Sequence, residues 1–364
     1  MQANKMVAAA ATKLKLKSSR LPILHKAKVE KGRASITNLD TSVIVDVGSE
    51  SDEGYLDPAL FGKTGNLAIS MTPFGGAGES EEFPTIPSGT EKTPVPACLF
   101  TKKLKTIASF ASKDQTRFCL CGVSFEKKKQ WIAATDGHVL MLERVAEIPC
   151  SPSGYSIPED FILSTEAIEI LGVFGFEVQS ATIFSTPTIV SNPPEAETPT
   201  APGRLYIQFK GDGWEVISKL IEGPYPDIER VFPPAKGKVQ YDVVKRDALV
   251  SAINAVLPIA STKTQLVRLD SDGYVKVANK DLEKFWKRKA GGEVISSHIP
   301  EIGFNASMLK QVLGSMTNEG FEMCFGETNI QGIMLNQRSR STLVMPLRIL
   351  KEGETVEPIE YTEI

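Results

Sequence analysis

Apolar and polar positions along this chain predict short strands joined by tight turns and separated by amphipathic helices. One such unit recurs three times in the 364 residues. Each copy starts with a helix that carries cations, continues with a hairpin of two alternating strands and ends in a small polar cluster. The expected helices cover residues 6–17, 100–112 and 246–260. This pattern predicts a repeated α+β fold.

The expected hairpins lie at residues 23–37, 117–134 and 266–278, where apolar side chains alternate between turn residues. A second helix candidate follows each of them, at residues 57–62, 164–173 and 305–316. Thr101 and Asn305 stand where helix N-caps are expected. Strands are also expected at residues 204–209 and 214–217.

Aromatic–proline pairs make rigid surface turns, and they mark the expected ends of domains at Phe83 with Pro84 and at Tyr225 with Pro226. We predict a first domain, a second domain with an exposed proline-rich loop, a third domain and an acidic tail. These cover residues 1–93, 94–234 (loop 191–203), 235–349 and 350–364.

The segment 343–349 is apolar apart from one arginine, although it lies near the end of the chain, where sequences usually become polar. Such a strand is typical of one wall of a peptide-binding groove. The tail that follows, 350–364, holds five glutamates and one lysine. Two interpretations of this tail stay open. It is solvated and disordered, or it folds back over the groove and competes with partner peptides.

Composition places the chain among ordinary globular proteins, with 41% hydrophobic and 23% charged residues. A short alanine-rich run near the N-terminus is followed at once by Lys13, Lys15 and Lys17, whereas a secretory signal would have its basic residues before the apolar run, so we expect a cytoplasmic protein. The net charge of −3 excludes a generally basic DNA-coating protein, but residues 1–36 hold nine Lys or Arg and one acid. This uneven charge can attract a polyanion to one surface.

Candidate chemistry is sparse. The five cysteines lack zinc-ligand spacing and the three histidines are far apart, so we expect free thiols and neither a metal site nor a cofactor. Asp136 and His138 leave a sheet-rich hydrolase as an alternative function, although an Asp-Gly pair is more often a simple turn. Residues 284–289 interleave aromatic and basic side chains, which is typical either of nucleic-acid binding or of an exposed loop or edge strand.

Five segments together resemble the bacterial replicative sliding clamp, the beta subunit of DNA polymerase III. They are residues 20–24, 134–140, 218–231, 302–305 and 344–348, which occur in the family's order and span nearly the whole chain. The resemblance implies three similar domains, each of two helices packed on small antiparallel sheets. Two protomers would close head to tail into a ring with helices lining the hole.

The same resemblance implies a non-catalytic processivity factor that encircles double-stranded DNA without reading its sequence. A hydrophobic pocket would bind short motifs of the replicative polymerase, the clamp loader and other clamp-binding proteins. The pocket residues that it implies are Leu120, Thr135, Gly137, His138, Leu140, Pro226, Arg230, Val231, Leu343, Met345, Pro346, Leu347 and Arg348.

The expected DNA-facing cations are Lys13, Lys15, Lys17, Arg20, Lys102, Lys103, Lys105, Lys113, Lys245, Arg246 and Lys263. The ring contact of the expected homodimer would pair Leu257 and Ile259 of one copy with Leu67 and Ile69 of the other. The chain departs from the family in a short first domain and a tail beyond Ile349. It also has Val139 where the family usually has an arginine, which we expect to remove one cation from the pocket rim.

Overall fold

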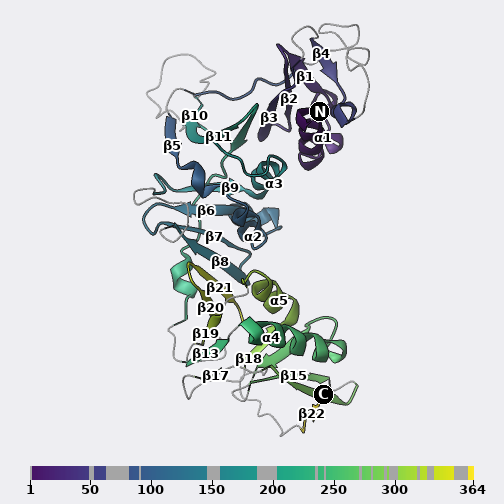
Figure 1. Ribbon diagram of the computed structural model, residues 1–364, viewed down its shortest axis with the longest axis vertical. Coiled ribbons are helices and arrows are strands. Elements are labelled where there is room, and N and C mark those ends of the chain that lie inside the picture. Colours follow the sequence, from purple (N-terminus) through teal and green to yellow (C-terminus); the bar gives the residue numbers. More distant parts are fainter. Residues whose placement is uncertain are drawn as a thin grey trace, which may run out of the picture. The chain divides into compact units, whose positions relative to one another are not determined.

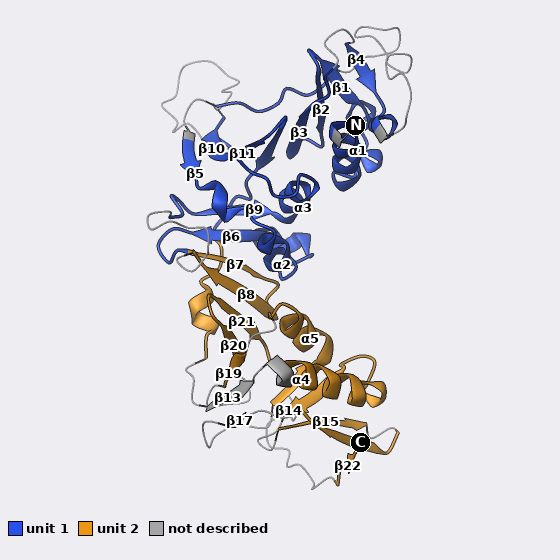
Figure 2. Cartoon of the chain, in the orientation of Figure 1, with its two compact units in different colours: residues 1–130, 149–224 blue, residues 131–148, 225–364 orange. Residues whose placement is uncertain are grey.

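We describe the chain from a computed structural model. The described residues are 2–48, 53–62, 82–89, 92–145, 156–186, 203–233, 237–241, 243–269, 273–279, 282–290, 293–294, 302–317, 320–325, 332–347 and 360–364. The chain divides into two compact units (Figure 2): unit 1 comprises residues 1–130 and 149–224, and unit 2 comprises residues 131–148 and 225–364. The division into three domains stays a prediction.

Unit 1 is built on an eight-stranded antiparallel sheet. In spatial order its strands are β4 (Gly54–Leu56), β1 (Ala27–Glu30), β2 (Arg33–Thr37), β3 (Thr41–Asp46), β12 (Trp214–Lys219), β11 (Leu205–Gly211), β10 (Ser180–Ser185) and β5 (Lys92–Val95). The pairing of β3 with β12 places Val43 opposite Val216, and both valines are buried. Two parts of the chain that are far apart in sequence therefore share one core (Figure 1).

Unit 1 also contains α1 (Gln2–Lys13), α2 (Lys103–Ala108) and α3 (Thr165–Val173), and α3 packs against both other helices. Ser164 caps α3, because its Oγ accepts a hydrogen bond from the Ala167 N–H at 3.1 Å. The strands β6 (Gly122–Glu126) and β9 (Phe161–Ser164) pair, which stacks Phe125 on Phe161. Short 3₁₀ helices are η1 (Leu16–Ser18), η2 (Pro22–His25), η3 (Pro58–Gly62), η5 (Ala97–Leu99) and η6 (Gln115–Cys121).

Unit 2 holds two runs of paired strands. The first runs in the order β17 (Glu293–Val294), β13 (Gly237–Tyr241), β19 (Phe321–Phe325), β20 (Ile333–Gln337), β21 (Arg340–Val344), β8 (Val139–Arg144) and β7 (Trp131–Thr135). The second is a five-stranded sheet in the order β18 (Ile302–Asn305), β14 (Leu266–Leu269), β15 (Tyr274–Asn279), β16 (Lys284–Lys289) and β22 (Thr362–Glu363). The helices are α4 (Val243–Val256), α5 (Ala306–Gly314), η8 (Ile228–Val231) and η9 (Leu257–Ile259).

Most of the expected helices and strands are confirmed, although the ends of several differ from the predicted ends. Asn305 caps α5 as predicted, because its Oδ1 accepts from the main-chain N–H groups of Ser307 and Met308 at 3.0 and 3.1 Å. The expected strands at 204–209 and 214–217 form β11 and β12, and the helix expected at 246–260 forms α4 and η9. The aromatic and basic segment 284–289 is an extended strand, β16. None of the described helices is long and apolar enough to cross a membrane.

Four local predictions are wrong. Residues 23–25 belong to the 3₁₀ helix η2 instead of the first strand of the hairpin expected at 23–37, and β1 begins only at Ala27. Residues 117–121 are 3₁₀ helix instead of strand, because the Asp114 carboxylate accepts hydrogen bonds from the Thr116 N–H and the Arg117 Nε and curls the chain. Thr101 does not cap α2, whose N-cap position is Lys102 and makes no side-chain hydrogen bond. The apolar segment from 343 is strand only to Val344; beyond Pro346, Leu347 makes one isolated bridge, and residues 348–349 lie outside the described part.

Candidate functional site

Three segments that are distant in sequence meet in unit 2: the β7–β8 turn at 135–140, the segment 225–232, and the end of β21 with residues 345–347. Antiparallel pairing of β8 with β21 sets Leu140 opposite Leu343. Past the end of β21, the Met345 N–H donates to the His138 carbonyl at 2.8 Å. The Leu347 N–H donates to the Gly303 carbonyl of β18 at 2.7 Å. Main-chain hydrogen bonds thus fix the third segment against the turn.

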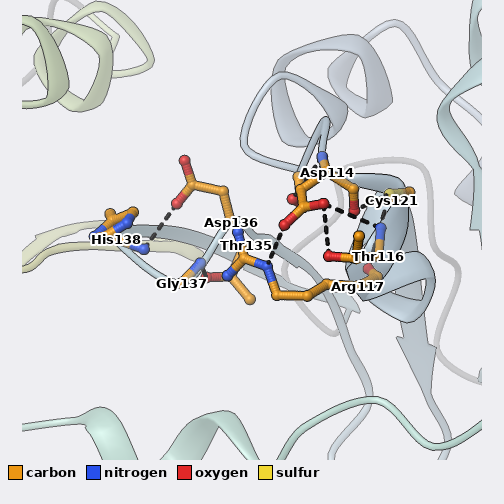
Figure 3. A network of polar contacts seen from close by, with 9 residues as sticks. Asp114, Thr116, Arg117, Cys121, Thr135, Asp136, Gly137 and His138 are labelled. Carbon is orange, nitrogen blue, oxygen red and sulfur yellow. Dashed lines mark hydrogen bonds and ion pairs between the residues drawn. The ribbon is translucent and has the colours of Figure 1, made fainter.

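The turn itself is held by its own polar side chains (Figure 3). The Asp136 Oδ1 accepts from the main-chain N–H groups of His138 and Val139 at 2.8 and 2.9 Å. Thr135 Oγ1 donates to the Val139 carbonyl at 2.7 Å and accepts from the Gly137 N–H at 3.0 Å. Gly137 has φ +91°, a left-handed conformation that favours glycine.

These contacts give Asp136 a structural role, because its carboxylate accepts from the main chain of its own turn. In the described part of the chain, no group of three or more His, Cys, Asp and Glu residues has the arrangement of a metal site. The geometry therefore favours the turn interpretation of Asp136 with Gly137 over the hydrolase alternative.

The second segment lies against the turn through one aromatic residue. The Tyr225 hydroxyl accepts a hydrogen bond from the Thr135 N–H at 3.0 Å. Asp227 opens η8 by accepting from the Glu229 N–H at 3.2 Å, and it pairs with Arg230 Nε at 3.1 Å. Within η8 the buried Ile228 joins an apolar cluster with Trp131, Ala133, Leu140, Leu142 and Leu343. The partly buried Tyr225, Phe232 and Met345 pack on this cluster.

The predicted pocket residues of unit 2 divide into a buried floor and an accessible surface. Leu140 and Leu343 are each 2% exposed, so they belong to the core instead of supplying the depth of an open pocket. Val231 is 44% exposed, and the side chain of Arg230 is 83% exposed. The other accessible members are Gly137, His138, Pro226, Met345, Pro346 and Leu347. We call Val231 together with residues 345–347 the docking surface.

Three further positions of the expected pocket and its rim lie apart from the docking surface or outside the described residues. Leu120 is buried at the end of η6 in unit 1, where its carbonyl accepts from the Ser112 N–H at 2.8 Å. Arg348 lies outside the described residues. Val139 is 1% exposed and pairs with Val344 inside the sheet. The side chain of Val139 thus belongs to the core, and the expectation that the pocket rim lacks one cation stays a prediction.

The expected cations of unit 1 lie on and around the helices. Lys13, at the end of α1, forms an ion pair with Glu169 of α3 at 3.1 Å. Lys15 and Lys113 line a cavity of about 750 Å³ together with acidic residues that include Glu166. Burial raises the pKa of the Glu166 carboxyl, although a hydrogen bond from Asn38 opposes this. Lys17, Arg20, Lys102 and Lys105 are exposed, and Lys103 is half-buried.

The expected cations of unit 2 differ in availability. Arg246 Nη1 donates to the Met316 carbonyl at 3.0 Å, so this guanidinium ties α4 to the chain just after α5. That contact and the pairing with Asp247 give Arg246 a structural role that the sequence did not indicate. Lys263 is exposed after η9. Lys245 lies in α4, but its side chain is outside the described part.

The expected ring contact is only partly accessible. Leu257 is half-buried, whereas Ile259 is 3% exposed, and its carbonyl accepts from Asn279 Nδ2 at 2.7 Å. Leu67 and Ile69 lie outside the described residues.

Sequence reasoning missed residues that build the docking surface from below. Tyr225 was noted for its proline neighbour, but nothing in the sequence indicated that its hydroxyl would accept from the Thr135 N–H. Trp131 stands in a short apolar stretch, which predicts its burial, but Ile228 stands between Asp227 and Glu229, so the sequence did not indicate that the two residues share a cluster.

Comparisons with known proteins agree with the resemblance drawn from the sequence. No family model matches the chain. The beta sliding clamp of Pseudomonas putida is 28% identical over 280 residues, covering 74% of this chain and 70% of the relative. The beta sliding clamp of Pseudomonas aeruginosa is 25% identical over 324 residues, covering 86% and 78%.

A solved structure of the beta sliding clamp of C. crescentus has a TM-score of 0.71 at 18% identity and covers 95% of this chain and 98% of that one. The expected clamp fold is confirmed by this likeness. This chain is thus a sequence relative of the bacterial beta sliding clamps and has their fold over nearly its whole length.

Proposed function

We propose that this chain is a DNA sliding clamp, a non-catalytic processivity factor of DNA replication in the cytoplasm. Its kinship with proteins named beta sliding clamps supports this function. The structural observation that carries it is the meeting of residues 135–140, 225–232 and 345–347 in unit 2. A continuous ladder of main-chain hydrogen bonds and one tyrosine hydroxyl hold these three segments together.

The docking surface is proposed to bind a short apolar motif of the replicative polymerase, the clamp loader and other partners. Val231, Met345 and Leu347 offer apolar contact, and methionine adapts to ligands of different shape. Arg230 is mostly exposed beside Asp227 and is able to turn towards a carboxylate or carbonyl of the motif. Arg348 and Leu120 are kept as members of this proposal on the resemblance alone. A surface of this size is expected to give micromolar affinity.

DNA is proposed to be held topologically, in a closed ring of two head-to-tail copies with three domains each. Lysines and arginines on the helices would contact phosphates without reading bases, by releasing counterions. Exposed Lys17, Arg20, Lys102 and Lys105 suit this role best. Ring closure is proposed near Leu257 and Ile259 of one copy and Leu67 and Ile69 of the other.

Primer extension with the replicative polymerase of the same source tests this function. Adding the chain and a clamp loader should lengthen the products synthesised in one binding event. The variants Val231→Glu and Met345→Glu should remove this effect. They should also lower the affinity for a fluorescent polymerase peptide at least tenfold, because a charge would be buried under the motif.

Leu282→Glu is the matched control, since Leu282 is an exposed apolar residue of the same unit, at 54%, with no proposed role. It should behave as the wild type. Products of unchanged length with the wild-type chain would contradict the proposed function. Normal peptide binding by Met345→Glu would contradict the docking surface.

A further inference from the structure

Unit 1 contains a second turn with the same hydrogen bonds as the β7–β8 turn of unit 2. It joins β2 to β3 and covers residues 37–41. Asn38 Oδ1 accepts from the main-chain N–H groups two and three positions further on, at 3.2 and 2.8 Å. Thr37 Oγ1 donates to the carbonyl four positions on at 3.2 Å and accepts from the N–H two positions on at 3.0 Å. The same four contacts hold residues 135–139.

The strand after this turn is also joined to its neighbour as in unit 2. β3 pairs with β12 in the way that β8 pairs with β21. At the end of β12, the Lys219 N–H donates to the Asp40 carbonyl at 2.8 Å. In unit 2 the Met345 N–H donates to the His138 carbonyl, also at 2.8 Å. Lys219 and Asp40 therefore hold the places of Met345 and His138.

The correspondence continues along the next residues of the chain. The Ile221 N–H donates to the Ile162 carbonyl of β9 at 3.0 Å, as the Leu347 N–H donates to the Gly303 carbonyl of β18. Both of these strands lead directly into a helix, β9 into α3 and β18 into α5. The docking surface of unit 2 thus has a structural counterpart in unit 1.

This counterpart is acidic at positions where unit 2 is basic. Asp40 stands where unit 2 has His138, and Glu222 stands where the sequence of unit 2 has Arg348. Asp40 is exposed, and the side chain of Glu222 is 63% exposed. Lys219 Nζ lies 3.9 Å from the Glu222 carboxylate, which is a long contact for an ion pair. Unit 1 therefore offers carboxylates where unit 2 offers an imidazole and a guanidinium.

The two carboxylates line the cavity of about 750 Å³ in unit 1 that also contains Glu166. The described part of its lining holds four carboxylates, and two of them have other partners. Glu169 pairs with Lys13 at 3.1 Å. Glu166 accepts a hydrogen bond at 2.9 Å from the asparagine of the 37–41 turn. Asp40 and Glu222 remain for a ligand.

Two exposed apolar side chains flank these carboxylates. Phe118 lines the same cavity, is 54% exposed and lies close to Gly223. Leu39 is 50% exposed and adopts φ +82°, a left-handed conformation that is unfavourable for leucine. The corresponding residue of unit 2 is Gly137, with φ +91°. The chain thus keeps a strained leucine where glycine would fit freely, and contact with a bound ligand would account for it.

We propose a second docking site, for a short extended peptide segment with a basic residue between two apolar residues. The site, which we call the acidic docking site, consists of Leu39, Asp40, Phe118, Ile221 and Glu222. Its carboxylates bind the cation of the segment, and its three apolar residues contact the apolar side chains. The cations that line the cavity, Lys15 and Lys113, are left to donate to main-chain carbonyls of the segment.

The chain's own tail does not fit this site. Its five glutamates and one lysine have the wrong charge for Asp40 and Glu222. Its described end, residues 360–364, is paired with β16 of unit 2 instead of being free in solvent or lying on the docking surface. The occupant is therefore part of another molecule. Its charge separates it from the partners proposed for the docking surface, so the two sites select different motifs.

Fluorescence anisotropy with the full-length chain tests this charge preference. The probes are three labelled peptides, Gly-Ser-Leu-Xaa-Phe-Ser-Gly, in which Xaa is arginine, glutamine or glutamate. The arginine peptide should bind with micromolar affinity, at least tenfold more tightly than the glutamate peptide. The double variant Asp40→Lys with Glu222→Lys should reverse this order, because it inverts the charge of the site and keeps the main-chain hydrogen bonds of the turn. Equal affinity of the wild type for both peptides, or an unchanged order in the double variant, would overturn the proposal.

Leu39→Gly separates a role in binding from a role in the fold. Glycine relieves the left-handed strain, so the urea midpoint of unit 1 should stay the same or rise. Trp214 reports this midpoint when Trp131→Phe and Trp286→Phe are also present. The affinity for the arginine peptide should nevertheless fall at least fivefold. Leu205→Ser is the control and should bind as the wild type, since Leu205 is a 42% exposed leucine of the same unit outside the described lining of the cavity. A midpoint and an affinity that fall together would contradict the role of Leu39 in the site.

This inference uses the architecture of the proposed docking surface but is tested separately from it. Met345→Glu should lose the polymerase peptide and keep the arginine peptide, whereas Asp40→Lys with Glu222→Lys should do the opposite. Loss of the arginine peptide in Met345→Glu would place that peptide on the docking surface and overturn the second site. A polymerase peptide that does not bind the wild-type chain would contradict the proposed function alone. Tighter binding of a single-stranded thymidine oligonucleotide than of the arginine peptide, lost in Phe118→Ser, would indicate a nucleic-acid site instead.

Discussion

Replacing Arg340 by methionine is expected to destabilise unit 2 strongly, because it leaves a buried charge without its counterion. The Glu143 side chain is 2% exposed, and its carboxylate accepts from Arg340 Nε at 3.1 Å and from Ser339 Oγ at 2.8 Å. Arg340, whose side chain is 11% exposed, also donates to the Ser315 carbonyl next to α5. One guanidinium therefore links β8 and β21 to the residue that follows α5.

The magnitude follows from this burial. Removing one partner of a buried ion pair costs about 3–5 kcal/mol, since the remaining buried carboxylate loses its counterion. An exposed pair is worth less than about 1 kcal/mol. Arg230→Met is the matched control, because Arg230 pairs with Asp227 at the same 3.1 Å in the same unit while its side chain is 83% exposed. The double variant Glu143→Met with Arg340→Met should recover most of the loss.

Urea unfolding followed by tryptophan fluorescence measures this loss of stability. All variants also carry Trp214→Phe and Trp286→Phe, so that the fluorescence reports on Trp131 of unit 2 alone. Arg340→Met should lower the midpoint far more than Arg230→Met does. Equal free energies of unfolding for these two variants would refute the argument that burial, not distance, sets the strength of the pair.

The remaining predictions concern smaller contacts. Asn305→Ala should cost about 1 kcal/mol in urea unfolding of unit 2, because two N–H groups at the start of α5 lose their acceptor; an unchanged midpoint would contradict the cap. Glu166→Gln should stabilise the chain at neutral pH, because burial raises the pKa of Glu166 and so the folded state disfavours its ionised form. This gain should vanish in acid, where the wild-type group is protonated in both states; a gain that is independent of pH would contradict the assignment. Asp136→Ala should weaken binding of the polymerase peptide, whereas Asp136→Asn keeps an acceptor for the turn and should bind nearly normally. Equal loss in both Asp136 variants, measured by anisotropy, would favour a direct role for the charge.

The sequence predicted the regular elements because their signals are local. Period-two alternation located β11 and β12, and an asparagine before an amphipathic run located the start of α5. The failure at residues 117–121 has a local cause as well, since Asp114 bonds to the main chain and turns an apolar stretch into 3₁₀ helix. A pattern of apolar and polar positions does not record such a side-chain contact.

The candidate site was predictable as a set of segments but not as a surface. The resemblance brought together residues 134–140, 225–231 and 343–348. In the structure these segments are hydrogen-bonded to one another in unit 2, as far as residue 347. Which side chains remain accessible depends on packing from elsewhere: Ile228 covers Leu140 and Leu343, and Val139 is buried by its pairing with Val344. The tail pairing with β16 depends on contacts across some 75 residues, and the sequence alone carries no signal for them.

Retention on circular DNA tests the clamp function most directly. The chain is loaded by its clamp loader onto a nicked circular plasmid, the salt is raised to screen phosphate contacts, and gel filtration separates bound from free protein. We predict that the chain stays with the circle at high salt and is lost when a restriction enzyme cuts the plasmid once. Retention that survives cutting, or that disappears with salt on the intact circle, would contradict a ring that encloses DNA.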